Sequence, residues 1–404
     1  MPHRLRAHRR IATPLLMSTL SLAAASALAQ EVATERTPYY IGLSQSFSRD
    51  SNVYRTSTNE VAETISSTGV VAGFDQPIGR QRFYGDAAAQ INRYRNVDAL
   101  NNKSYALTTG LDWETVDFLS GTLRYSTRNS LADFGTLGGS TAASDQTTQQ
   151  FLASARYGIT SKLGLDGSYE RRSLKYKSAA YSDRDYSQNA VSAGLHWGTA
   201  GVLVFGVAVR ATKGVTPEAL PTPPREDELK RRDVDFTTVW TPTGFSILST
   251  RLSSTKETHT LSTSGDVSAV TGSLAWNYRP TAKLNFTTSL TRDTGTETTF
   301  ISPAGAGSTP LRVDNNRLST SAALEARYAL TSKISLSGEG RRRQGTLATG
   351  EGESITSYGL GFSYLPTRSA TLGCSLGRDS RDASGATTAY TATTTSCSAQ
   401  ITLK

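Results

Sequence analysis

Apolar and polar residues alternate along most of the chain from Pro38 onward. In residues 119–126, leucine, glycine and tyrosine occupy the odd positions, while serine, threonine and arginine occupy the even ones. The same pattern recurs in residues 163–170 and 357–364. Because successive side chains of a strand point to opposite faces, this period predicts an all-β chain whose strands each have one apolar and one polar face. Alternation alone fits a soluble sandwich as well as a membrane barrel.

A repeat of strand ends favours the barrel. An aromatic residue closes one strand, a few small or turn-forming residues follow, and the alternation resumes at once, as in residues 157–163. Each repeat contains two strands joined at the far end by a longer connector, such as residues 133–148, 214–228 and 295–313. Short turns at one end and long loops at the other are typical of outer-membrane barrels. Seven aromatic residues mark the repeat at steps of 36 to 50 residues: Trp113, Tyr157, Trp197, Trp240, Tyr278, Tyr328 and Tyr364.

The turns also predict the number of strands. An eighth turn lies at residues 75–80, so that eight turns join sixteen strands, and residues 39–50 and 390–404 add one strand at each terminus. The sequence thus predicts a transmembrane antiparallel up-and-down β-barrel of about 18 strands, with short periplasmic turns and longer extracellular loops. Sixteen strands are the alternative if residues 257–267 are misassigned.

The seven aromatic residues at the turns predict a girdle at the periplasmic interface, where amphipathic rings prefer to lie. The alternative is that they are ordinary strand-end aromatics that cover a soluble core. Such a core would not need the aromatic residue at the same end of each hairpin.

The first 29 residues predict a secretory signal peptide. A basic run from Arg4 to Arg10 precedes an apolar stretch, and Ala27-Leu28-Ala29 before Gln30 is a small-x-small cleavage site. An anchor helix is the alternative, but the apolar stretch contains Pro14 and several hydroxyl residues and is short for a span. Residues 30–404 are then the mature barrel, which we expect in the outer membrane of a Gram-negative bacterium.

The charge balance does not indicate a nucleic-acid binder. The chain has 43 Lys and Arg against 34 Asp and Glu, and cleavage removes four arginines, which leaves 39 against 34. The mean hydropathy is −0.35, and no window of the mature chain approaches eighteen uninterrupted apolar residues. This excludes spanning helices but not spanning strands.

The two cysteines are predicted to face each other. If Gly385 and Ala386 centre the last connector, Cys374 and Cys397 are partners on adjacent strands, both in the apolar phase. Export passes through an oxidising compartment, which favours a disulfide. Two lipid-facing thiols are the alternative, because directly opposed positions often have imperfect disulfide geometry.

Residues in the polar phase are candidates for the lining of a pore. The side chains expected to point inward include both basic and acidic residues, so that the predicted lumen is polar and of mixed sign. The candidate lining residues are Arg124, Arg128, Arg156, Arg172, Arg327, Arg341, Arg343, Tyr84 and Tyr94. The two tyrosines are candidates for sugar stacking, or else pack inside the wall.

Basic residues crowd the loop-side ends of the strands. This rim is expected either to attract an acidic polymer or to pair with phosphates of the surrounding glycolipid leaflet. Its members are Arg93, Arg95, Arg171, Arg172, Lys175, Lys177, Lys230, Arg231, Arg232, Arg341, Arg342, Arg343, Arg378 and Arg381. Residues 216–229 contain four prolines and predict a semi-rigid loop at the mouth.

Catalysis finds little support in the sequence. The mature chain has two histidines, His196 and His259, and no paired-histidine or cysteine cluster, so that neither a metal site nor another cofactor is predicted. A Ser192–His196 pair in a barrel hydrolase is conceivable, but serine is too common here to make the pairing specific. We therefore predict that the protein is not an enzyme.

Residues 39–130 carry several distinctive segments. Asp50-Ser51-Asn52-Val53-Tyr54-Arg55 follows the first expected strand, and the first turn has the sequence Pro77-Ile78-Gly79-Arg80-Gln81-Arg82-Phe83. Further matching positions are Asn92-Arg93-Tyr94, Leu100-Asn101, Tyr105 and Trp113. On these residues, about a quarter of the chain resembles the outer-membrane barrel proteins encoded in bacterial exopolysaccharide biosynthesis operons, the EpsL-like β-barrel porins. The most distinctive residues are those of the turn, namely Pro77, Gly79, Arg80, Gln81 and Arg82.

The resemblance implies a part in exopolysaccharide biosynthesis and export, with a polar passage for the secreted polymer. The expected partners are outer-membrane lipids and lipopolysaccharide, the exopolysaccharide, and periplasmic components of an export machinery; no nucleic acid is expected. Two alternatives stay open, a general diffusion porin and a non-conducting surface scaffold or adhesin that binds matrix polysaccharide.

Overall fold

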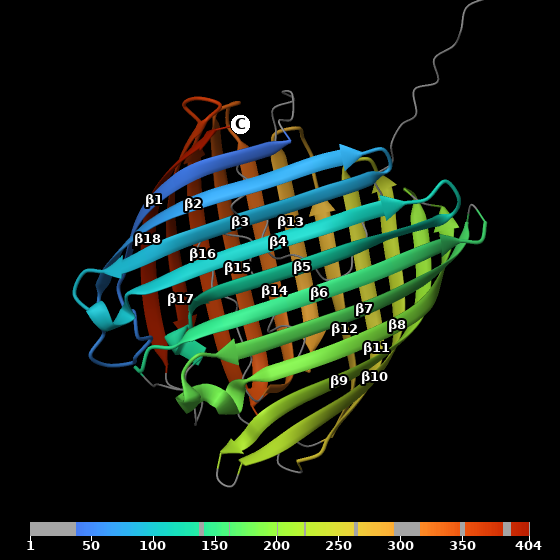
Figure 1. The fold of residues 1–404 in the computed structure, drawn as a ribbon, viewed down its shortest axis with the longest axis horizontal. Helices are drawn as coiled ribbons and strands as arrows, with labels where there is room; N and C mark the ends of the chain where they lie inside the picture. The colour runs from blue at the N-terminus through green and yellow to red at the C-terminus, as the bar shows by residue number, and fades with distance from the viewer. Residues whose placement is uncertain are drawn as a thin grey trace, which may run out of the picture.

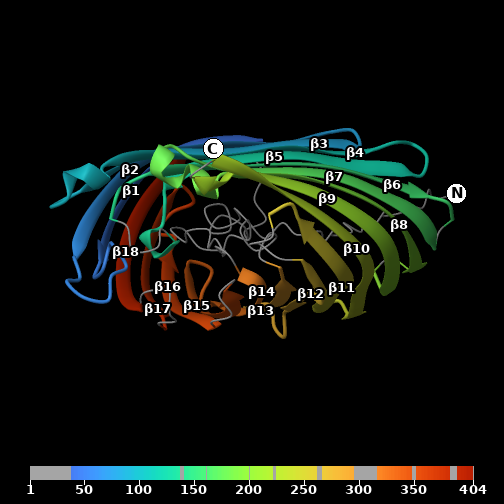
Figure 2. The same ribbon diagram turned by 90° about the horizontal axis from the view of Figure 1, so that it is seen from below.

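In a computed structural model, eighteen strands form one closed antiparallel sheet (Figure 1, Figure 2). Each strand pairs with its neighbours in sequence, and β1 pairs with β18, which closes the barrel. The prediction of eighteen strands is therefore confirmed. The sixteen-strand alternative is wrong, because one strand ends at His259, the next begins at Val267, and the two pair with each other.

The structure describes residues 38–136, 141–160, 162–199, 201–221, 224–261, 266–294, 316–347, 352–382 and 389–403. The predicted signal peptide lies outside the described residues. The strands are β1 (Tyr39–Asp50), β2 (Glu63–Ile78), β3 (Gln81–Tyr94), β4 (Asn102–Glu114), β5 (Leu119–Leu131), β6 (Asp145–Gly158), β7 (Leu163–Tyr176), β8 (Tyr186–Thr199), β9 (Leu203–Pro221), β10 (Pro224–Thr243), β11 (Ser246–His259), β12 (Val267–Tyr278), β13 (Leu284–Asp293), β14 (Asn316–Ala329), β15 (Ile334–Leu347), β16 (Gly352–Tyr364), β17 (Ala370–Arg381) and β18 (Tyr390–Leu403). In the described loops there are three short 3₁₀ helices: η2 (Asp98–Leu100), η3 (Phe134–Thr136) and η4 (Ala179–Arg184). Among the described residues, no helix is long and apolar enough to cross a membrane.

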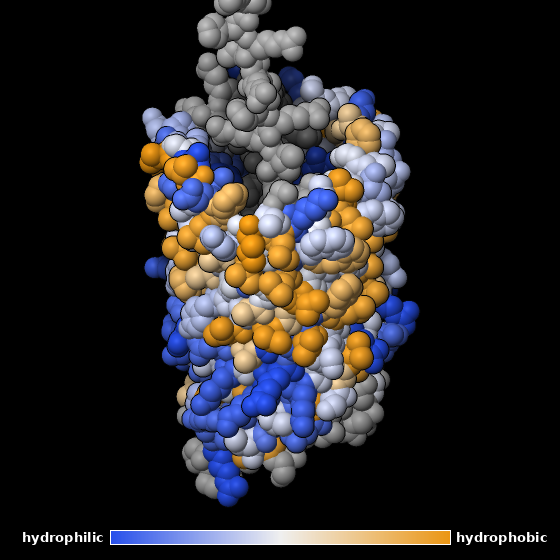
Figure 3. All heavy atoms as spheres, turned by 90° about the vertical axis from the view of Figure 1, so that its right-hand side faces the viewer, coloured by the Kyte–Doolittle hydropathy of each residue, from blue (hydrophilic) through white to orange (hydrophobic). Residues whose placement is uncertain are grey.

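The outer face of the barrel is apolar. Large side chains of the apolar phase are exposed there, such as Val270 at 65% and Leu360 at 66%, whereas their neighbours in sequence face the lumen and are small or polar. Figure 3 shows this surface as an apolar band above a hydrophilic end. Exposure of this kind is costly in water and favourable in hydrocarbon, so the barrel is a transmembrane one.

The two ends of the barrel differ as predicted. The connections at the tight-turn end are two to five residues long, whereas those at the other end reach 22 residues. Tyr39 pairs with Phe74 and Ile41 pairs with Leu403, so that both terminal strands reach the tight-turn end. Single-chain bacterial outer-membrane barrels share this arrangement, which places the tight turns in the periplasm.

One predicted loop is wrong. Instead of a loop at residues 216–229, β9 continues to Pro221 and β10 begins at Pro224, so that the pair forms a hairpin that protrudes beyond its neighbours (Figure 1). The ladder has an irregularity between Arg225 and Asp227. The protruding hairpin has no further strand to pair with, and proline is tolerated where no ladder hydrogen bond is required of it.

Four extracellular loops pack against one another at the loop-side end. Val53, Leu100, Phe134 and Tyr181 come from four different connections and form one buried apolar cluster. The rings of Tyr54 and Phe134 meet edge to face at 4.9 Å, and the Tyr181 hydroxyl donates to the carbonyl oxygen of Ala142 at 2.9 Å. We call this set the loop cluster. It was not predicted, because its contacts join segments far apart in the sequence.

The last hairpin is cross-linked. Cys374 lies directly opposite Cys397 in the register, and the two sulfur atoms are 2.19 Å apart in a disulfide. Both residues share the outward phase with Leu372, Leu376 and Ile401, which are exposed on the outer face.

Candidate functional site: the lumen

The lumen contains a cavity of about 2090 Å³ that extends from the tight-turn end to the loop-side end. At the tight-turn end it is lined by Arg279, Lys283 and Lys333. At the loop-side end it is lined by Arg55 and Phe134 of the loop cluster. Figure 2 shows the barrel from below as a flattened ring of strands around this space. A cavity of this size exceeds the usual range for small-ligand pockets.

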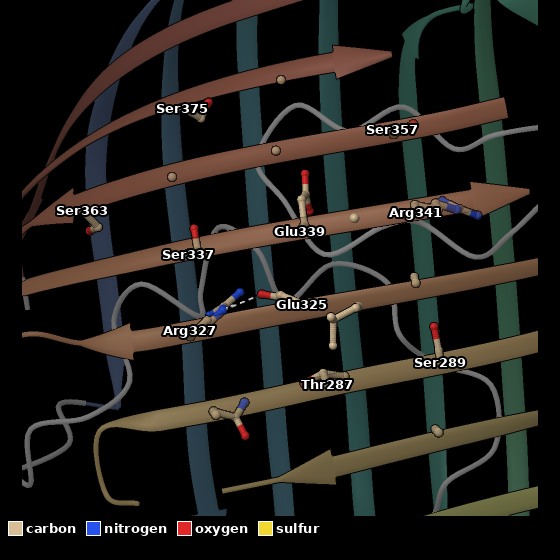
Figure 4. A pocket seen from close by; sticks show the side chains of 18 of the residues that line it. Thr287, Ser289, Glu325, Arg327, Ser337, Glu339, Arg341, Ser357, Ser363 and Ser375 are labelled. Carbon is tan, nitrogen blue, oxygen red and sulfur yellow. Dashed lines mark hydrogen bonds and ion pairs between the residues drawn. The ribbon is translucent and has the colours of Figure 1, made fainter. Parts of the chain in front are cut away.

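One half of the wall, from β11 through β18 to β1, is lined mainly by hydroxyl groups. Figure 4 shows Thr287, Ser289, Ser337, Ser357 and Ser375 pointing inward from four strands of this wall, β13, β15, β16 and β17. Glycines such as Gly361 and Gly373 lie between the serines and keep the surface flat. The hydroxyl groups result directly from the sequence, because Ser, Thr and Gly occupy the inward phase of these strands.

The hydroxyl groups form rows across the strands. Ser337 pairs with Gly361, Gly361 pairs with Ser375, and Ser375 pairs with Ser396 in the register. Ser396 in turn pairs with Ser48 of β1. Each hydroxyl group can both donate and accept a hydrogen bond. A row of this kind can therefore exchange partners with any polyhydroxylated solute that moves along the wall.

Charged side chains also line this half, and some of them are paired. The Arg327 Nε donates to Glu325 Oε1 at 2.6 Å, as the dashed line in Figure 4 shows. Glu339 and Arg341 lie above this pair and also point into the lumen.

The opposite wall, β3 to β8, has a row of ion pairs near the tight turns. The Arg82 Nε and Asp75 Oδ1 atoms are 2.7 Å apart, as are the Arg156 Nε and Asp166 Oδ1 atoms. Asp166 also accepts from His196, whose Nδ1 lies 2.6 Å from Oδ2. The basic groups of this row are thus neutralised within the wall, which leaves no simple cationic filter.

A second charged network is buried at the loop-side end of β9 to β13. The Arg231 guanidinium contacts Asp233 at 2.9 Å and Asp293 at 3.1 Å, and Arg210 contacts Asp233 at 3.3 Å. His259 joins the network through Glu257 at 3.1 Å. The carboxylates outnumber the guanidinium groups, and hydroxyl donors such as Ser253 and Thr255 satisfy their remaining lone pairs.

The loop cluster is anchored to β17 and β18 across the mouth. The Arg381 Nη1 donates to the carbonyl oxygen of Gly135, and the Arg381 guanidinium lies 5.0 Å from the centroid of the Tyr390 ring. Arg55 contacts Asp50 at 2.9 Å. Burial lowers the pKa of the Arg55 guanidinium, but the carboxylates of Asp133 and Asp50 raise it by more, so that its net pKa shift is upward. The Arg381 contacts thus hold the loops of the β1 to β8 side against β17 and β18.

The predicted lining residues all lie in the inward phase of their strands, but their surroundings differ. Arg156, Arg172, Arg327 and Arg343 form ion pairs with Asp166, Glu170, Glu325 and Glu353, respectively. Arg172 and Arg343 are buried, whereas Arg341 is half-buried and lines the cavity. Arg124 and Arg128 lie on β5, outside the residues that line this cavity.

The two candidate tyrosines do not form a continuous track. The Tyr84 ring lies over Gly110 of the next strand and carries the Arg82 guanidinium at 5.2 Å from its centroid. Tyr94, ten residues further along β3, packs against the loop cluster instead. Tyr40 was missed by the sequence analysis. Its ring lies over Gly73 and its hydroxyl donates to Asp86 at 2.8 Å. An inward aromatic residue opposite a paired glycine is the signal that could have revealed it.

The turn at residues 77–82, on which the family resemblance mainly rests, has a structural role. Gly79 has a φ of +61°, which favours glycine. The Arg80 Nη1 donates to the Thr115 carbonyl oxygen at 2.6 Å, and the Gln81 amide exchanges two hydrogen bonds of 3.2 Å with the Glu114 backbone. Pro77 pairs with Arg82 in the ladder. These residues therefore tie the first tight turn to the second.

The aromatic residues at the tight turns face outward. All seven lie in the outward phase, and Tyr157, Trp197 and Trp240 are exposed by 45 to 58% at the periplasmic border of the apolar band.

Ser192 and His196 do not form a pair. The Ser192 hydroxyl bonds to Ser168 at 2.7 Å, and His196 bonds to Asp166. Among the described residues, no group of three or more His, Cys, Asp or Glu side chains could hold a metal ion.

Known porins are distantly similar to this chain. No protein-family model matches the sequence, and no curated protein matches it either. OpdL of Pseudomonas aeruginosa is similar with 12% identity and a TM-score of 0.47, over 91% of this chain and 98% of that one. OccK2 (OpdF) of the same organism, solved in complex with glucuronate, is similar with 12% identity and a TM-score of 0.47, over 91% of this chain and 98% of that one. A BenF-like porin from Pseudomonas fluorescens Pf-5 is similar with 11% identity and a TM-score of 0.47, over 90% of this chain and 99% of that one. Similarity at this level carries no information about substrate, and the resemblance to the exopolysaccharide-operon family stays a prediction.

Proposed function

We propose that this outer-membrane barrel is a porin-like passage for a secreted polysaccharide. The observation that carries the proposal is the hydroxyl-lined half of the lumen wall, from β11 through β18 to β1. A sugar polymer presents hydroxyl groups at regular intervals, and the wall offers matching groups that both donate and accept.

The wall also suits movement rather than tight capture. Conduction requires binding sites that are weak and numerous, so that a solute can both enter and leave. The serine hydroxyls are small, nearly equivalent and spaced across successive strands, and the glycines between them leave no side chain in the way of a chain that slides past. The paired charges of the opposite wall neither attract nor repel an uncharged polymer strongly.

Single-channel conductance in a planar bilayer tests the proposal. Refolded residues 30–404 are inserted, and fragments of the exopolysaccharide of the source bacterium are added, with an unrelated neutral glycan as the control. We expect steady conductance that the fragments interrupt more than the unrelated glycan does. Conductance that is indifferent to both would favour a general diffusion porin, and a silent bilayer would favour a surface scaffold.

A matched pair of variants locates the interaction. The triple variant Ser337→Ala, Ser375→Ala, Ser396→Ala removes three hydroxyl groups of one cross-strand row without narrowing the lumen. Each lost hydrogen bond is worth about 0.5–1.5 kcal/mol, so we expect the fragment-induced blocks to shorten by about tenfold while the open conductance stays unchanged. The control variant Ser254→Ala, Ser268→Ala, Thr288→Ala alters the outward phase instead, at residues that do not line the cavity. Equal block durations in both variants would contradict the role of the wall.

A further inference from the structure

Four cations form a patch on the outer face of β9, β10 and β11. Lys213, Lys230, Arg232 and Lys256 are exposed and share the outward phase with the apolar side chains of these strands. In the register Lys213 lies directly opposite Lys230, and Arg232 lies directly opposite Lys256. We call these four residues the outer basic patch.

The carboxylates around the outer basic patch are too few to neutralise its four cations. Glu228 contacts Lys213 at 3.0 Å and Lys230 at 3.6 Å. Within the part of the chain that the structure describes, no carboxylate pairs with Arg232 or Lys256. Like charges directly opposite each other destabilise a strand pair. An external anion that neutralises the patch would therefore stabilise it.

The inward cations of the same strands, unlike the outward ones, have carboxylate partners within the wall. Arg210 and Arg231 alternate with the outward cations along β9 and β10, and both are held by the carboxylates of Asp233 and its neighbours in the wall. Because the inward cations have internal partners, the outward excess is specific to the surface that faces away from the lumen. An acidic polymer inside the lumen could not reach it.

The patch lies at the border of the apolar band. Val234 follows Arg232 in the outward phase and is 55% exposed, Leu252 precedes Lys256 by four residues and is 59% exposed, and Val209 precedes Lys213 by four residues and is 60% exposed. Glu226 and Glu228 lie on the other side of the patch, toward the loops. From the membrane outward, the surface is thus apolar, then cationic, then acidic. The hydrophilic surface below the apolar band in Figure 3 lies at the end where the β9–β10 hairpin protrudes in Figure 1.

We propose that the outer basic patch binds the phosphate groups of a phosphorylated glycolipid of the outer leaflet. Such a lipid has acyl chains, phosphates and sugars in the same order along the membrane normal as the apolar band, the patch and the polar surface beyond it. Arg232 can hold a phosphate with two parallel hydrogen bonds, whereas the three lysines supply point charges. The acyl chains would lie against Val234, Phe236 and Leu252, which a free phosphate ion would not use.

Native mass spectrometry of the detergent-solubilised barrel tests this site. The probe is a purified bis-phosphorylated, six-chain disaccharide glycolipid, and the same lipid after enzymatic dephosphorylation is the control ligand. We expect the wild-type barrel to retain the phosphorylated form at least tenfold more tightly than the dephosphorylated one. Inorganic phosphate at millimolar concentration should not displace it, since the acyl chains contribute to binding. Equal retention of the two lipids, displacement by phosphate alone, or displacement by polygalacturonate would overturn the proposal.

Two variants with the same change in charge locate the site. Lys213→Gln, Lys230→Gln, Arg232→Gln, Lys256→Gln removes the patch, and Lys162→Gln, Arg279→Gln, Lys283→Gln, Arg368→Gln removes four exposed cations at the tight-turn end. We expect the first variant to retain the phosphorylated glycolipid about tenfold more weakly than the wild type, and the second variant to retain it as the wild type does. A similar loss in both would contradict a defined site. If the first variant does not fold, as judged by an unchanged gel mobility on boiling, the double variant Arg232→Gln, Lys256→Gln is compared with Lys283→Gln, Arg368→Gln in the same way.

Discussion

Gly79 shows how a single residue fixes a turn. Its φ of +61° places it in the left-handed region, and a Cβ there would meet no other atom within 4 Å, so that backbone conformation alone opposes substitution. We expect Gly79→Ala to lower the free energy of unfolding by about 1–2 kcal/mol. Gly244 is the matched control, since it also has open space around it but no positive φ. Urea unfolding in lipid vesicles measures both variants, and equal midpoints would contradict the argument.

The cysteine pair makes a second residue-scale prediction. Cys374 and Cys397 are separated by 23 residues in sequence and close the last hairpin. A cross-link across such a span restricts the unfolded chain and is worth about 3 kcal/mol. We expect the Cys374→Ala, Cys397→Ala variant to unfold at a lower urea concentration than the oxidised protein, and to match the wild type after reduction. Two free thiols in the exported protein would show that the bond does not form in the cell.

The direction of each side chain could be predicted from the sequence, but its partners could not. The period of two placed Arg156 and Arg327 in the lumen, because phase follows from strand geometry alone. Their pairing with Asp166 and Glu325 depends on the register of neighbouring strands and on rotamers, which a single sequence does not specify. Phase also divides the predicted basic rim into two groups. Arg231 and Arg343 point inward and are buried, whereas Arg232 and Arg342 point outward and are exposed.

Among the elements, we expect the loop cluster to limit the width of the mouth. Phe134 is 4% exposed and packs against Tyr54, while the adjacent Gly135 is held by Arg381 on the far wall. Truncation of a buried phenylalanine costs about 3–5 kcal/mol, which exceeds what a few loop contacts can absorb. We expect Phe134→Ala to release the loops and to raise single-channel conductance and its fluctuations, with the barrel still folded.

The control for this prediction is Phe118→Ala at a tight turn, where the ring is 66% exposed. It should leave the conductance of the channel unchanged. If Phe134→Ala also conducts like the wild type, the loop cluster does not restrict the entrance.

Strands were easier to predict than their extensions. Each tight turn has an aromatic residue and a restart of the alternation, which located the hairpins from β4 to β17. The extension of the β9–β10 hairpin into residues 216–229 was not predicted, because Pro217, Pro221 and Pro224 are typical of loops and the pairing there involves these two strands alone. The loop cluster was missed for a different reason, since its residues come from four separate connections that are far apart in the sequence.

The whole molecule combines an apolar exterior, a wet lumen and a closed ring of strands. Barrel closure pairs all eighteen strands, which leaves no free edge in the membrane. The architecture could therefore be predicted from alternation and turn spacing. The solute could not, because it depends on the combined surface that nine or more strands present to the lumen, and no single motif encodes that surface.

Release of polysaccharide from liposomes tests directly whether the lumen conducts the polymer. The purified variant Ser337→Cys is prepared in two forms, one unlabelled and one whose thiol has been labelled with a bulky maleimide in detergent. Each form is reconstituted into liposomes that enclose fluorescently tagged exopolysaccharide fragments. Ser337 points into the lumen, and the control variant Val116→Cys places the label at a tight turn where the side chain is 82% exposed. We expect that fragments escape through the unlabelled barrel, that labelling at residue 337 stops the release, and that labelling at residue 116 does not. Absence of release from the unlabelled barrel, or release that ignores the label at residue 337, would contradict it.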